Sequence, residues 1–76
     1  MTHEMNEGVV KWAAQRAKAA LEALDAHDKE TRRLLAQRAN GEPLMHGRLD
    51  GRSDARIDLA AQVAETSRVL VKAVLG

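Results

Sequence analysis

The feature that most constrains this fold is one short break, residues 41–51, in a sequence otherwise built from helix-forming residues. This segment holds three of the five glycines and the only proline, Pro43, of the 76-residue chain. Ala, Leu, Glu, Lys, Arg and Gln, which favour helices, dominate the sequence on either side. Two long helical stretches with one break between them predict an all-α protein, a long antiparallel two-helix hairpin that forms one domain over residues 1–76.

Local signals predict where the first helix begins and ends. Asn6 is a good N-cap for a helix over about residues 7–39. Asn40-Gly41 can supply a left-handed C-terminal cap, and Pro43 prevents the helix from continuing. At 1.5 Å per residue, this helix would be about 50 Å long.

The second helix is predicted after a loop over residues 40–52. Ser53 is expected to be its N-cap, and Asp54 would lie in its first turn. The helix would then continue over about residues 54–75, a length of about 33 Å.

The first helix carries an inward stripe whose members alternate in spacing between three and four residues. The stripe consists of Val10, Ala13, Ala17, Ala20, Leu24, His27, Thr31 and Leu34. Its alanines allow another helix to approach closely. His27 lies in the stripe, which favours a hydrogen-bonded histidine at the helix–helix seam over a metal ligand.

The second helix is apolar around about two thirds of its circumference, because its polar positions fall within an arc of about 120°. One apolar side consists of Ile57, Ala60, Ala61, Ala64, Val71 and Leu75. A hairpin covers only one side of this helix, so the other side requires another chain. The predicted oligomer interface consists of Leu59, Val63, Leu70 and Val74, with Trp12 as an anchoring residue.

Composition also favours assembly into a homo-oligomeric helical bundle. The chain has 14 alanines, one Trp and no Phe or Tyr, so its core volume is small. It has no Cys, which excludes disulfides and thiolate metal sites. A monomer of this size and composition would be only marginally stable, and self-association is the remaining means of stabilisation.

Several function classes are disfavoured by what the sequence lacks. The isolated serines and scattered histidines form no catalytic or metal-binding pattern, so we expect neither an enzyme nor a bound metal or cofactor. The apolar runs are far shorter than the roughly 20 residues that span a bilayer. The N-terminal residues do not resemble a signal peptide, and the expected location is therefore the cytoplasm.

Positive charge concentrates in the middle of the chain. Residues 29–56 hold seven basic and four acidic side chains, and six of the seven are Arg. Arg48, Arg52 and Arg56 follow one another at steps of four, near His46 and the amide-rich start of the second helix. Such a helix start suits a phosphate group. The alternative is that these arginines form surface ion pairs with neighbouring carboxylates.

The layout of the chain also resembles a known family. Met5-Asn6-Glu7 precedes a long Ala/Leu-rich helix and a polar turn, and a closing helix runs from Arg56 to Val74 with Thr66 before its last apolar run. This arrangement is similar to the helical-hairpin family of phage anti-CBASS sponges. The resemblance implies a compact oligomer that sequesters a cyclic oligonucleotide signal.

Two functions are therefore predicted as alternatives. In the first, the protein is an oligomeric binding protein for a small phosphate-bearing ligand, and its predicted ligand-binding residues are Arg48, Arg52, Arg56, His46, Thr66 and Arg68. In the second, it is an adaptor, inhibitor or antitoxin-like module that binds another protein through the second helix. Duplex DNA is a poorer candidate, since the pI is near 8.2 and carboxylates are intermixed with the arginines.

Overall fold

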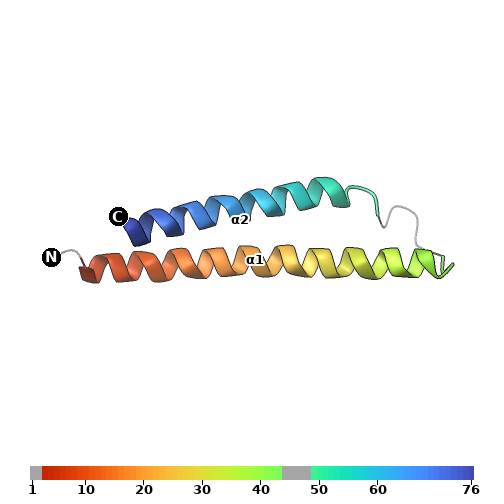
Figure 1. Ribbon diagram of the computed structural model, residues 1–76, viewed down its shortest axis with the longest axis horizontal. Helices are drawn as coiled ribbons and strands as arrows, with labels where there is room; N and C mark the ends of the chain where they lie inside the picture. The colour runs from red at the N-terminus through yellow and green to blue at the C-terminus, as the bar shows by residue number, and fades with distance from the viewer. Residues whose placement is uncertain (1–2, 44–48) are drawn as a thin grey trace.

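A computed structural model describes residues 3–43 and 49–76 of the chain. Two helices, α1 (His3–Ala39) and α2 (Arg52–Leu75), lie side by side and run antiparallel (Figure 1). The molecule is a thin rod of 62 × 16 × 14 Å. No strand occurs within the described ranges. The prediction of an all-α two-helix hairpin is confirmed.

The end of α1 is the one that the sequence predicts. Gly41 has a left-handed backbone, with φ of 79°, which glycine adopts without steric cost. Its N–H donates to the Arg38 carbonyl at 3.1 Å, and the Glu42 N–H donates to the Gln37 carbonyl at 2.9 Å. These two bonds form a complete Schellman motif, which satisfies carbonyls that the helix leaves unpaired.

Both helices begin before the residues predicted to cap them. Asn6 lies inside α1, and Ser53 lies in the first turn of α2. The N-cap of α2 is Gly51, with φ of 74° and no capping side chain. The reason for the earlier start is tertiary, because Arg52 makes contacts with α1 that hold it in the helix. Those contacts outweigh the local capping preference of Ser53.

The seam between the helices is narrow because α1 presents small side chains to α2. Ala13, Ala17 and Ala20 are buried, and Thr66 is the buried residue of α2. Every member of the predicted α1 stripe is buried or half-buried, which confirms it as the inward face. Leu34, near the loop end of α1, is the one large side chain that is fully buried among the described residues.

The orientation of α2 divides the predicted oligomer interface. Leu59, Val63 and Leu70 are half-buried, and α1 is the only other described element that can cover them. The structure therefore places these three residues inside the hairpin, whereas Val74 and Trp12 are exposed. The exposed apolar side of α2 is instead the one that contains Ile57, Ala61, Ala64, Val71 and Leu75.

This orientation follows from contacts at the start of α2. Arg52 and Arg56 both reach α1, and the alternating spacing of four and three that they begin continues through Leu59, Val63, Thr66, Leu70 and Ala73. Arginines were not predicted in the seam, so the inner side of α2 could not be distinguished from the outer side by hydrophobicity alone.

Within the described ranges, neither helix is both long and apolar enough to cross a membrane.

Candidate functional site

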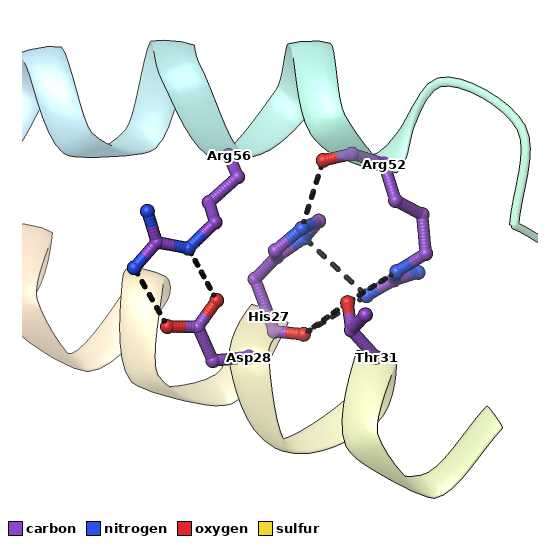
Figure 2. Close-up of polar contacts among 5 residues, drawn as sticks. All are labelled: His27, Asp28, Thr31, Arg52 and Arg56. Carbon is purple, nitrogen blue, oxygen red and sulfur yellow. Dashed lines mark hydrogen bonds and ion pairs between the residues drawn. The ribbon is translucent and has the colours of Figure 1, made fainter. Parts of the chain in front are cut away.

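The most developed polar cluster of the described structure lies where α2 begins. Arg52 and Arg56, one turn apart on α2, extend towards His27, Asp28 and Thr31 on α1 (Figure 2). The three α1 residues also lie within about one turn of each other. Two short helical segments therefore meet through polar side chains, whereas alanines and larger aliphatic side chains form most of the rest of the seam.

The Arg52 guanidinium is held by three hydrogen bonds to neutral acceptors. Nε donates to Thr31 Oγ1 at 2.6 Å, and Nη2 donates to the His27 carbonyl at 3.0 Å. Nη2 also lies 3.3 Å from His27 Nδ1. Among the described residues, no carboxylate contacts Arg52. Its positive charge is thus fixed in position, with no acidic partner in the part of the chain that the structure describes.

These contacts also define the form of the His27 ring. A guanidinium nitrogen can only donate, so His27 Nδ1 must accept from Arg52. His27 Nε2 lies 3.2 Å from the Arg52 carbonyl and must carry the proton that this contact needs. This arrangement corresponds to the tautomer that carries its proton on Nε2 and accepts at Nδ1.

Arg56 is paired differently from Arg52. Its Nε and Nη2 donate to the two carboxylate oxygens of Asp28, at 2.9 and 3.3 Å. The hydrogen bond from Arg56 lowers the pKa of Asp28 below its usual value. The pair is solvent-accessible, so water and salt screen the attraction between its charges.

A shallow pocket opens beside this cluster. It is lined by His27, Asp28, Thr31, Arg32, Arg52, Ser53 and Arg56. Three arginines thus face a single carboxylate. Within residues 3–43 and 49–76, Arg32 makes no hydrogen bond or ion pair, and the Ser53 and Asp54 amides have no acceptor. A net positive pocket at an uncapped helix start is suited to bind an anion.

The structure brings together only part of the predicted ligand set. Arg52 and Arg56 share the pocket, but Thr66 is about 15 Å further along α2 at 1.5 Å per residue. The Thr66 hydroxyl donates to the Gln62 carbonyl at 2.7 Å within its own helix. Arg68 is exposed and still more distant from Arg52. The predicted residues His46 and Arg48 lie outside the described residues.

Three residues of the cluster were missed as site residues. His27 and Thr31 were assigned to the inward stripe, and their polar contacts with Arg52 follow from that position. Asp28 lies beside the stripe, and only the orientation of α2 shows that it faces Arg56. A polar interruption in an alanine stripe is the sequence signal that could have located them.

A second hollow lies nearer the start of α1. It is lined by Trp12, Ala13, Arg16, Glu65, Thr66 and Val69. The Arg16 guanidinium carbon is 5.1 Å from the centre of the Trp12 ring, a cation–π contact. The contact holds the half-exposed indole against its own helix, and the predicted role of Trp12 at an oligomer interface stays a prediction.

Within the described part of the chain, no group of three or more His, Cys, Asp or Glu side chains is arranged to hold a metal ion. In comparisons with protein-family models, curated proteins and solved structures, this chain matched none of them. These comparisons therefore assign no function to the chain.

Proposed function

We propose that this protein is a non-enzymatic, homo-oligomeric binding protein that sequesters a small phosphate-bearing ligand. The observation that carries the proposal is the Arg52 guanidinium, which is held by neutral acceptors and has no carboxylate partner among the described residues. Such a cation is already oriented before the ligand arrives, so less conformational entropy is lost on binding.

The neighbouring groups extend this single cation into a site. Arg32 and the Ser53 hydroxyl line the same pocket, and Arg56 can exchange its bonds to Asp28 for bonds to a phosphate. Hydrogen bonds between charged groups contribute about 1.5–3 kcal/mol each before desolvation and ordering costs. Asp28 opposes the binding of an anion, so we expect moderate affinity per chain that decreases as salt increases.

The class of ligand comes from the resemblance to phage anti-CBASS sponges. A cyclic oligonucleotide signal is the candidate, and an anti-defence role in a phage is the corresponding biological proposal. Among the described residues, the pocket lining includes no Trp, Tyr or Phe, and the His27 ring is held by its contacts with Arg52. We therefore expect the phosphates, rather than the bases, to dominate recognition by a single chain.

Calorimetry against cyclic di- and trinucleotides, mononucleotides and inorganic phosphate, at two salt concentrations, tests the proposal. Arg32→Gln removes a pocket arginine that makes no hydrogen bond or ion pair within the described structure, so it should weaken binding at least about tenfold without unfolding the chain. Lys18→Gln is the matched control, because it removes one exposed positive charge of the same helix outside the pocket, and this variant should bind nearly as the parent does. Equal affinities of the two variants, or no heat with any phosphate ligand, would contradict the proposal.

The second candidate is a protein-interaction module, such as an adaptor, inhibitor or antitoxin-like protein. The observation that favours it is the exposed apolar side of α2, where Ile57 and Val71 are 66% and 52% exposed. If no phosphate ligand binds and a different protein is recovered with the chain in stoichiometric amount, this function replaces the first.

A further inference from the structure

The outer side of α2 has the spacing of a second helix-pairing seam. We define the outer face as six exposed residues, spaced alternately by four and three: Ile57, Ala61, Ala64, Arg68, Val71 and Leu75. This is the repeat by which two helices pack along their length. The outer face lies roughly opposite the side of α2 that packs on α1.

The hairpin itself leaves much apolar surface uncovered. Among the described residues, only Ala13, Ala17, Ala20 and Leu34 form a buried hydrophobic core. Large apolar side chains on the outer face remain in water, up to 82% exposure at Leu75. Covering them would remove apolar area from water that the fold of one chain does not bury.

We propose that the outer face binds the outer face of a second copy of this chain, with the two α2 helices antiparallel about a two-fold axis level with Thr66. In this register Ile57 lies opposite Leu75 of the second copy, and Ala61 lies opposite Val71. Ala64 lies opposite Arg68. Each alanine thus faces a larger side chain, so the volumes across the seam are complementary.

The charges beside the outer face support the same arrangement. Asp58, Glu65 and Lys72 are exposed and follow one flank of the face at intervals of seven. In the antiparallel register Asp58 lies opposite Lys72 of the second copy, and symmetry repeats this pair. Glu65 comes near Glu65 of the second copy at the axis. The two Arg68 side chains lie beside this pair and offset the repulsion between its carboxylates.

A parallel arrangement is much less favourable on the same residues. It would place Arg68 against Arg68 inside an apolar seam and Ala61 against Ala61, which leaves a gap. The antiparallel pairing instead lets the aliphatic part of Arg68 cover Ala64 while its guanidinium remains near water. The pairing deepens the oligomeric part of the proposed function, and its test needs no ligand.

Sedimentation equilibrium in phosphate-free buffer tests whether the chain dimerises through the outer face, and circular dichroism follows the helix content of each variant. Val71→Glu places a charge in the seam and should raise the dimer dissociation constant at least about 100-fold. Val69→Glu is the matched control, an exposed valine on the same helix but off the outer face, and should change it by less than about fivefold. A parent chain that is monomeric at tens of micromolar, or equal effects of the two variants, would overturn the proposal.

A charge exchange tests the orientation. Asp58→Lys alone sets two lysines against each other in each pair, and Lys72→Asp alone sets two aspartates against each other. Each variant should therefore dimerise about tenfold more weakly than the parent. When the two variants are mixed, one chain carries lysine at both positions and the other carries aspartate at both. A dimer with one chain of each kind therefore pairs every lysine with an aspartate. They should form a heterodimer, which native mass spectrometry resolves by mass. In a parallel pairing Asp58 would face Asp58 and Lys72 would face Lys72, so neither substitution alone would weaken the dimer. Single variants that dimerise as tightly as the parent would therefore overturn the antiparallel register, and so would a mixture without preference for the heterodimer, whether or not phosphate ligands bind.

Discussion

Arg52 and His27 hold each other across the hairpin through both their side chains and their backbone carbonyls. His27 Nε2 contacts the Arg52 carbonyl at 3.2 Å, and Arg52 Nη2 contacts the His27 carbonyl at 3.0 Å and His27 Nδ1 at 3.3 Å. A stripe of alanines permits close approach but has little shape to prevent one helix from sliding along the other. The Arg52–His27 contacts supply the directional interactions that define the register of α2 on α1.

Removing an acceptor of Arg52 should destabilise the hairpin. Thr31→Val keeps the shape of the side chain but leaves the half-buried Nε of Arg52 without its 2.6 Å partner. The expected loss is about 1–3 kcal/mol of unfolding free energy, measured by urea denaturation. Thr66→Val is the control, because among the described residues the Thr66 hydroxyl bonds only to carbonyls of its own helix, and its loss should cost much less.

The Asp28–Arg56 pair predicts a specific acid sensitivity. Because Arg56 lowers the pKa of Asp28 in the folded chain, the unfolded chain binds this proton more readily. The resulting stabilisation is complete above the ordinary value of 3.8 and is lost as the pH falls below it through the folded pKa. Asp28→Asn should therefore be less stable than the parent at pH 6, and the difference should shrink towards pH 2.5. Urea midpoints that differ equally at both pH values would contradict this account.

Much of the fold could be predicted from the sequence because its signals are local. Asn40-Gly41 ends α1 through backbone geometry that a left-handed glycine makes possible, and the alternating stripe from Val10 to Leu34 needs only helical periodicity. The start of α2 could not be predicted in the same way. There a tertiary contact of Arg52 overrides the capping signal of Ser53.

The candidate site could be predicted only in part, for a related reason. The accumulation of arginines near the turn is visible in the sequence, and Arg52 and Arg56 do share one pocket. Which side of α2 faces α1 is a property of the assembled hairpin, because both sides are apolar. Thr66 therefore lies in the alanine seam, and Asp28 becomes the partner of Arg56.

Leu34 should be the most sensitive apolar position of the chain. It is fully buried, whereas its neighbour Leu35 is 44% exposed. Leu34→Ala removes a packed side chain at an expected cost of about 2–5 kcal/mol, which is enough to unfold a domain of this size under many conditions. Leu35→Ala should cost less than about 1 kcal/mol. Thermal unfolding followed by circular dichroism separates the two, and equal losses would contradict the assignment of Leu34 to the core.

The alanine seam should resist larger side chains even though they are more hydrophobic. Ala17 is buried between the helices, whereas Ala26 is exposed on the same helix. Ala17→Leu has no space to occupy unless α1 and α2 move apart, and that movement would also strain the contacts between Arg52 and His27; we expect a loss of about 1–3 kcal/mol. Ala26→Leu should change stability by only a few tenths of a kcal/mol, since Leu and Ala are both good helix formers. Urea denaturation of the two variants measures the difference. An Ala17→Leu chain as stable as the Ala26→Leu chain would mean that the helices are not held together by close approach at this position.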